Sequence, residues 1–355
     1  MKKLFSFLFK LIGILILAVA ILFGWLTVTE YDPAPAEDIQ VTNAGDNHLL
    51  SPGAELSVLS WNVGYGGLGK DSDFFMDGGK NSKSADEATV KLYLSGISST
   101  IAETDSDLIL LQEVDINSSR TYGIDERGYL EAGMNCGSFA LNYSCPFVPI
   151  PFPPIGKVNS GLFTATADLT IEKAERISLP CPFSWPSRIA NLKRCLLVNY
   201  LPIDGSDKRL VLVNLHLEAY DSGEGKIAQT KQLREFITGE YEKGNYVIAG
   251  GDFNQVFPGS LELYPNTHPE NWEPGVLDDD LLPEGWTLAY DLSTPTCRLL
   301  NQPYDPADTE GTQYYVIDGL ILSPNVKLKS VETLDTGFTC SDHNPVRLEV
   351  RLSIE

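Results

Sequence analysis

The sequence predicts an α/β (α+β) domain in which helices cover β-sheets, preceded by one N-terminal transmembrane helix. Three features support this prediction: short apolar runs typical of buried strands, two longer stretches with helical periodicity, and a charge-free apolar run near the N-terminus. With 43% hydrophobic and 21% charged residues, the composition is that of a globular protein rather than a disordered or fibrous one. We therefore expect a large core beyond the N-terminal segment.

The N-terminal apolar run extends without a charge over residues 11–28. At about 1.5 Å per residue it just spans a hydrocarbon core of about 30 Å. Lys2, Lys3 and Lys10 precede the run, which predicts an N-terminus in the cytoplasm and a domain outside it. A cleaved secretory signal is the alternative, but the run is long for one and residues 34–36 offer no clean cleavage site. We expect a single-pass anchor in the cell membrane; if it were cleaved, the domain would be secreted.

Three regions follow from this pattern. Residues 1–29 form the cytoplasmic N-terminus and the anchor, and residues 53–355 form the globular domain. Residues 30–52 are polar and acidic, contain prolines and show neither helical nor strand periodicity, so they are predicted to be a flexible tether that keeps the domain near the bilayer.

The predicted strands are short apolar runs rich in Val, Ile and Leu on both faces, as expected for sheets that are covered on each side. They occupy residues 56–63, 107–114, 210–217, 246–254 and 315–322.

Residues 85–103 and 225–241 carry apolar side chains at helical spacing and each separate two predicted strands. The strand–helix–strand order thus occurs twice and predicts two similar halves around one core. Residues 335–354 end the chain with a half-exposed strand, because apolar and charged side chains alternate there. Residues 116–159 and 256–288 lack a regular period and are predicted to be long surface insertions.

The six cysteines fit an exported, oxidising environment, in which disulfides such as Cys136 with Cys145 are plausible, although sequence alone cannot assign a pairing. Free buried thiols are the alternative. The net charge of -22 repels polyanions, so nucleic acid is a less favoured partner.

Polar side chains stand at the ends of the apolar runs, where a buried strand would normally exclude them. They are Asn62, Glu113, Asn214, His216, Asp252, Asn254 and Asp318. Any one of them alone is most simply a cap or a turn residue. Together, at one edge of a core, they would repel one another and lose solvation unless a cation or a hydrogen-bond network compensated them. A divalent metal is the simplest explanation.

In this order and spacing, the strand-end motifs resemble those of the endonuclease/exonuclease/phosphatase superfamily, across about residues 54–353. The motifs are Ser60-Trp61-Asn62-Val63, Leu111-Gln112-Glu113-Val114, Asn159-Ser160-Gly161, Asn214-Leu215-His216, Gly251-Asp252-Phe253-Asn254, Ile317-Asp318-Gly319 and Ser341-Asp342-His343. The resemblance implies a four-layer sandwich, in which two facing mixed β-sheets are flanked by helices and a single active site lies at one end.

The resemblance also implies a metal site. Glu113 would be the principal ligand of Mg²⁺, or of Mn²⁺, with Asn62 and Asp342 nearby. Such a site matches the preference of Mg²⁺ for few carboxylates and several waters.

The remaining motif residues would act on the phosphate. Asp252 would orient or deprotonate the attacking water, and Asn254 would hold a phosphate oxygen. His343, paired with Asp318, would act as acid or base or stabilise the transition state, and His216 would contact the phosphate or the leaving group. Which of them is the general base stays open.

The first predicted insertion is rich in aromatic residues, namely Tyr129, Phe139, Tyr143, Phe147 and Phe152. They suggest an apolar wall for a lipid-like leaving group, or alternatively a small local core. We therefore predict a monomeric metal-dependent phosphodiesterase acting on a lipid or small extracytoplasmic substrate. The alternatives are an exported nuclease acting on DNA, a phosphomonoesterase, and a catalytically inactive phosphate-binding module.

Overall fold

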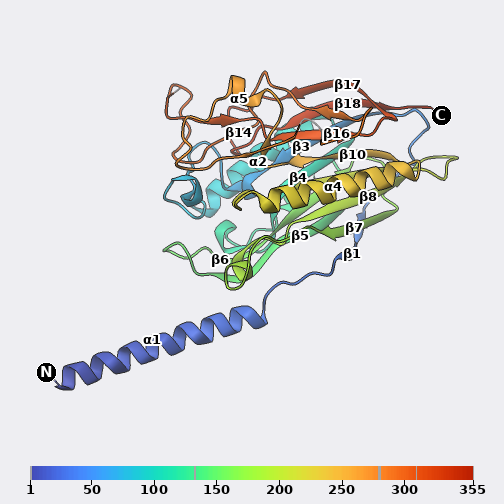
Figure 1. Cartoon of the computed structure of the whole chain (residues 1–355). Helices are drawn as coiled ribbons and strands as arrows, with labels where there is room; N and C mark the ends of the chain where they lie inside the picture. Colours follow the sequence, from blue (N-terminus) through green and yellow to red (C-terminus); the bar gives the residue numbers. More distant parts are fainter. Residues whose placement is uncertain (1, 132, 279–280, 309, 355) are drawn as a thin grey trace.

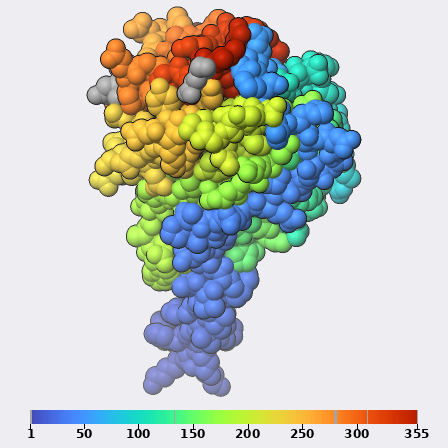
Figure 2. All heavy atoms as spheres, turned by 90° about the vertical axis from the view of Figure 1, so that its right-hand side faces the viewer, coloured from blue at the N-terminus to red at the C-terminus, as the bar shows by residue number. Residues whose placement is uncertain are grey.

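The structure is a computed structural model that describes residues 2–131, 133–278, 281–308 and 310–354. Helix α1 (Lys2–Val28) projects from a layered domain as a separate arm (Figures 1 and 2). By length and composition it can cross a membrane, and little of it is buried. A signal sequence near the N-terminus would meet the same criteria.

Two seven-stranded sheets form the centre of the domain. The first sheet has the order β1 (Ala36–Ile39), β7 (Lys173–Ser178), β8 (Cys195–Pro202), β9 (Arg209–His216), β10 (Tyr246–Asp252), β16 (Asp318–Leu322) and β13 (Thr287–Ala289). The second sheet has the order β17 (Val326–Thr333), β18 (Val346–Leu352), β3 (Glu55–Asn62), β4 (Leu108–Asp115), β6 (Gly156–Thr166), β5 (Cys136–Val148) and β2 (Val41–Asn43). The smaller two-stranded sheets pair β11 (Gln255–Val256) with β12 (Gly275–Val276) and β14 (Cys297–Arg298) with β15 (Tyr314–Tyr315).

Each large sheet contains a parallel pair joined by a long helix. Helix α2 (Glu87–Thr104) connects β3 to β4, and α4 (Glu224–Glu242) connects β9 to β10. Asp86 begins α2 by accepting a hydrogen bond from the Thr89 backbone N–H at 2.8 Å, a typical N-cap. The repeated strand–helix–strand order predicted from the sequence is confirmed.

Apolar side chains fill three spaces between four layers. Leu110 of the second sheet and Leu212 of the first belong to one cluster between the sheets. Ile237 of α4 belongs to the cluster on the outer face of the first sheet, and Ile97 of α2 to that on the second. The four-layer sandwich implied by the resemblance is confirmed.

The segment predicted to be a flexible tether is paired with the domain instead. β1 is antiparallel to β7 and β2 is antiparallel to β5, so residues 36–43 extend one edge of each sheet. An edge strand gains its stability from backbone hydrogen bonds to its neighbour, so its own sequence need not show a strand period.

The first predicted insertion, residues 116–159, is not a loop. It contains β5 and the start of β6, which form a long hairpin in the second sheet. Register shifts between Leu141 and Tyr143 and between Cys145 and Val148 interrupt this pairing. A bulge reverses the in–out alternation of side chains along a strand. The sequence of β5 therefore lacks the regular alternation by which a strand is predicted.

In the described part of the second predicted insertion, the elements are short: α5 (Ser260–Leu263), β12 and the start of β13. The shorter helical segments elsewhere are η1 (Gly64–Gly66), η2 (Phe75–Asp77), η3 (Ser119–Thr121), α3 (Arg127–Leu130) and η4 (Ser187–Ala190). All six cysteines are free, including Cys136 and Cys145, for which a disulfide was plausible.

Candidate active site

Strand register brings three of the predicted residues side by side at one end of the first sheet. Asp252, the last residue of β10, is paired with His216 of the parallel strand β9 and with Asp318 of the antiparallel strand β16. The three side chains are buried. Because β9 and β10 end together while β16 begins there, polar groups from distant parts of the sequence gather at one edge.

Asn62, at the end of β3, links this edge to the second sheet. Its Nδ2 group donates to Asp252 Oδ2 at 3.0 Å and to Glu113 Oε1 at 3.1 Å. Its Oδ1 atom accepts from the Gly64 backbone N–H at 3.0 Å, which fixes the orientation of the amide. Asn62 therefore holds a carboxylate from each sheet.

Glu113 owes its position to a bulge in β4. The pairing of β4 with β6 shifts register between Leu111 and Val114, and Glu113 has a φ of 57°. A non-glycine residue in the left-handed region is uncommon and is typical of bulges and functional sites. The Glu113 side chain thereby turns toward Asn62, and the residue is only half-buried.

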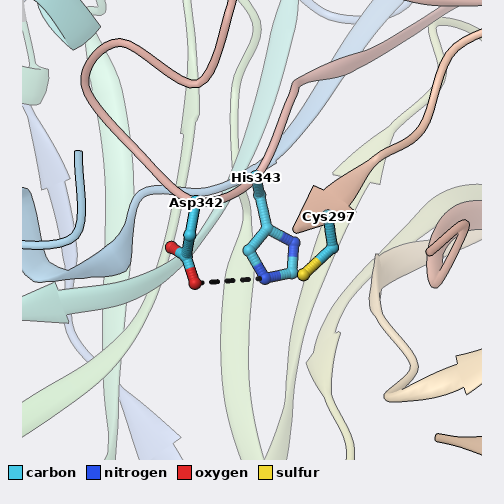
Figure 3. Close-up of side chains that lie close together, drawn as sticks. All are labelled: Cys297, Asp342 and His343. Carbon is cyan, nitrogen blue, oxygen red and sulfur yellow. Dashed lines mark ion pairs between the residues drawn. The ribbon is translucent and has the colours of Figure 1, made fainter. Parts of the chain in front are cut away.

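His343 lies between carboxylates. Its Nδ1 atom is 2.8 Å from Asp318 Oδ2, and its Nε2 atom is 3.8 Å from Asp252 Oδ2. On the other side, Nε2 lies 4.0 Å from Asp342 Oδ2 (Figure 3). Burial alone would lower the pKa of His343, but the charge of Asp318 and its hydrogen bond outweigh burial and hold the pKa well above its usual value. The raised pKa favours the imidazolium form of His343.

The pKa of His216 is shifted in the opposite direction. Its Nε2 atom is 3.4 Å from Asp252 Oδ2. Burial, reinforced by the nearby charges of Arg194 and His343, holds the pKa of His216 well below its usual value. The two shifts favour a neutral imidazole at His216 and a protonated one at His343, on either side of Asp252.

Two of the carboxyl groups, those of Asp252 and Asp342, resist ionisation. Burial raises the pKa of Asp252 to about 7, and the charge of Asp318 adds to the shift, which His343 opposes. Burial raises the pKa of Asp342 to about 6, where His343 again opposes and Glu113 adds to the shift. A carboxylate with a pKa near neutrality is suited to general base catalysis.

Asn254 and Asn214 differ in their relation to the site. Asn254 has a φ of 51°, its backbone N–H donates to Asp252 Oδ1 at 2.8 Å, and its Nδ2 group donates to the Leu217 carbonyl. Asn214 instead bonds between the sheets: its Nδ2 group donates to the Leu111 carbonyl, and Gln112 donates to its Oδ1 atom. Asn214 thus has a structural role beneath the site.

A cavity of about 540 Å³ opens over these groups. Its polar lining includes Glu113, His216, Asp252, Asn254, Asp342 and His343. Most of its other lining residues are apolar. Of the predicted site residues, only Asn62 and Asp318 are absent from the lining, and both bond directly to groups that are present.

Several lining residues were not predicted as site residues. Arg120 is buried against Asp115 at 2.8 Å, and the Tyr220 hydroxyl donates to Asp77 at 2.9 Å. Cys297 lies beside His343 (Figure 3) and pairs with it in an isolated β-bridge. None stands at the end of a long apolar run, so the signal that marked the other site residues does not apply to them.

Among the described residues, two groups of donors have ligand atoms within 4.8 Å of one another, as a metal ion requires. They are Asp252, Asp318 and His343, and Cys297, Asp342 and His343. Both include His343, whose Nδ1 atom is already bonded to Asp318. Oxygen donors such as Glu113 and Asp342 suit a hard divalent ion better than a histidine or a thiol does.

Comparisons with known proteins agree with this fold. A sequence profile of the Endonuclease/Exonuclease/phosphatase family matches residues 59–343. A search of curated proteins by sequence found no significant match.

Among solved structures, an endonuclease/exonuclease/phosphatase from Beutenbergia cavernae DSM 12333 is similar at 17% identity and a TM-score of 0.55, over 84% of this chain and 72% of that one. ANGEL2, a 2',3'-cyclic phosphatase, is similar at 16% identity and a TM-score of 0.54, over 88% and 98% of the two chains. The human Nocturnin catalytic domain is similar at 16% identity and a TM-score of 0.50, over 89% and 97%. These similarities concern the fold.

Proposed function

The chain belongs to the endonuclease/exonuclease/phosphatase family of phosphoric ester hydrolases, and we propose that it is a phosphodiesterase dependent on Mg²⁺ or Mn²⁺. The observation that carries this proposal is the position of Asp252, which lies within 4 Å of His216 and His343 and is bonded to Asn62. This arrangement combines a proton acceptor with a cationic donor, as phosphoester hydrolysis requires.

Glu113 and Asp342 would hold the metal, together with Asn62. The buried Asp342 carboxyl, whose pKa is raised to about 6, would be compensated by a divalent cation. Asn62 Oδ1 accepts one hydrogen bond, from Gly64, and a carbonyl oxygen has a second lone pair for a ligand bond. When bound, the ion would polarise the phosphoryl group and offset its developing charge.

The protein's own groups would supply the proton transfers. Asp252, with a pKa near 7, would accept the proton of the attacking water. The protonated His343 would donate its Nε2 proton to the phosphate or to the leaving oxygen. Asp318 would meanwhile hold the other imidazole proton on His343 Nδ1. The neutral His216 and Asn254 would orient the phosphate, with His216 within reach of the leaving group.

The substrate is proposed to be a phosphodiester rather than a phosphomonoester, and a lipid or small molecule rather than DNA. A net charge of -22 disfavours a polyanion at long range, and an apolar cavity wall suits a hydrophobic leaving group. The domain would act outside the cytoplasm as a monomer, with α1 as its membrane anchor.

The test uses the full chain in detergent with bis(4-nitrophenyl) phosphate, phospholipids, sphingomyelin, nucleotides and DNA, with Mg²⁺, Mn²⁺ or chelator. Asp252→Asn and His343→Ala should each lower kcat by about 10²–10⁴-fold. Matched controls are Asp207→Asn and His268→Ala, because both residues lie in loops outside the cavity lining. Activity that survives chelation and both site substitutions would refute the mechanism, and binding of phosphate without turnover would favour an inactive binding module.

A further inference from the structure

Helix α1, the candidate membrane span, forms part of one side of the cavity that contains the catalytic groups. Phe23 and Leu26, in the last turns of α1, line the same cavity as His343 and Asp252. Leu22, Phe23 and Leu26 follow helical spacing and share one face. Leu26 is only 3% exposed, whereas most of α1 is exposed.

The contact between α1 and the domain is built from several interactions. Leu26 packs in an apolar cluster with Val148 and Ile189. Trp185 Nε1 donates to Thr27 Oγ1 at 3.1 Å. Just beyond the helix, Glu30 is paired with Lys193 at 2.9 Å and with Arg188. The C-terminal end of α1 is therefore packed against the domain at the cavity.

The depth of this contact in a bilayer follows from the sequence. The charge-free run covers residues 11–28, so Phe23 and Leu26 fall at its outer end, in the leaflet on the side of the domain. The cavity wall that they form is therefore at the level of the outer hydrocarbon layer. The catalytic groups of the same cavity would lie nearer the polar boundary.

Exposed apolar side chains lie at the wall of this cavity and beside α1. Ile150 is 66% exposed and lines the cavity, Phe152 of the same loop is 96% exposed, and Trp185 is 56% exposed. The Trp185 ring also lies 6.4 Å from the ring of Phe23. A single exposed apolar residue needs no explanation, but aromatic and apolar side chains gathered beside a membrane helix are typical of a surface that contacts the bilayer interface.

We propose that the cavity takes one hydrocarbon chain of a membrane phospholipid, which enters from the outer leaflet alongside α1 and brings its phosphate to Asp252 and His343. The chemistry of cleavage rests on the function proposed above, whereas the binding of the chain does not. A lipid drawn into water would lose a factor of about four in its equilibrium for each exposed methylene. An apolar cavity that is continuous with the bilayer avoids this loss, so the anchor helix is also part of the substrate-binding site.

The test compares two substitutions in α1. Leu26→Trp places a larger side chain at the cavity wall, whereas Leu17→Trp makes the same change at a residue that is 60% exposed. The full chain in lipid nanodiscs is assayed on a dipalmitoyl phospholipid and on soluble bis(4-nitrophenyl) phosphate. We expect Leu26→Trp to lower the ratio of kcat/KM for the phospholipid to kcat/KM for bis(4-nitrophenyl) phosphate by about tenfold or more. Leu17→Trp should leave both values unchanged.

A second measurement does not depend on turnover. A phospholipid with a diazirine near the carboxyl end of one palmitoyl chain is photolysed in the same nanodiscs, and the labelled peptides are mapped. Leu299 and Leu300 line the cavity and are each 2% exposed, so the label reaches them only from inside it. We expect labelling there in the wild type and in Leu17→Trp, and its loss in Leu26→Trp.

The outcomes separate the two proposals. Labelling of α1 without labelling of residues 299–300, or an unchanged activity ratio in Leu26→Trp, overturns the lipid-chain site. Labelling of residues 299–300 without metal-dependent hydrolysis of any phosphodiester supports the lipid-chain site and refutes the proposed function instead.

Discussion

Replacing Asp318 by Asn should move the alkaline limit of activity toward neutral pH. In the wild type the Asp318 carboxylate is 2.8 Å from Nδ1 of His343, and both side chains are buried, so solvent screens their attraction little. The substitution keeps the shape and removes the charge. An opposite charge at such a distance raises a pKa by roughly one to three units, which corresponds to about 1.4–4 kcal/mol.

The direction follows from the role of His343 as a proton donor. Activity should fall as pH rises through the pKa of His343, so the alkaline limb of kcat/KM in Asp318→Asn should lie at a lower pH than in the wild type. The folded-state pKa of His343 is raised above its unfolded value. The ion pair therefore stabilises the protein fully below the unfolded pKa, and this contribution is lost as pH rises through the folded pKa.

The assay is a pH profile of kcat/KM at fixed metal concentration, combined with NMR titration of the imidazole protons. With four histidines in the chain, the signals can be assigned by single substitutions. Asp335→Asn, in an exposed turn, is the matched control. An alkaline limb and a His343 titration that both remain at the wild-type pH would refute the charge assignment of the Asp318–His343 pair.

Three further predictions concern stability and metal binding. Asp252→Asn should raise the melting temperature of the metal-free protein more at pH 8 than at pH 4. A pKa raised to about 7 in the folded state means that Asp252 destabilises the fold once pH exceeds the unfolded pKa. Equal shifts of the melting temperature at both pH values would contradict this. Asn214→Ala should lower the free energy of unfolding in urea by about 2–6 kcal/mol, since it removes the Asn214 amide that donates to the Leu111 and Phe163 carbonyls between the sheets, and a loss below about 1 kcal/mol would show that these carbonyls find other partners. Glu113→Gln should weaken Mg²⁺ or Mn²⁺ binding at least about tenfold in calorimetric titration, and an unchanged affinity would mean that the metal lies elsewhere.

Local patterns were sufficient where one element carries its own signal. Helices α2 and α4 lie close to the predicted residues 85–103 and 225–241. The alternation of apolar and charged side chains near the C-terminus corresponds to β18, whose buried and less buried residues alternate. In such elements each side chain faces the core or the solvent according to a period that the sequence displays directly.

Patterns failed where pairing with a distant strand replaces a local signal. Strands β1 and β2 are held at sheet edges by backbone hydrogen bonds, which leave no trace in side-chain order. Bulges in β5 break the alternation that would have revealed it. The same applies to Asn214, which shares a strand face with His216 yet bonds between the sheets.

The sequence by itself determined the repeated strand–helix–strand order, the family resemblance and most of the residues that meet at the site. Only the tertiary structure decided the directions in which the pKa values of His216 and His343 are shifted, the orientation of Asn62 and the contact of α1 with the cavity. The reason is physical: a pKa, an amide orientation and a cavity wall depend on groups that are close in space and far apart in the chain, such as Asp318 beside His343.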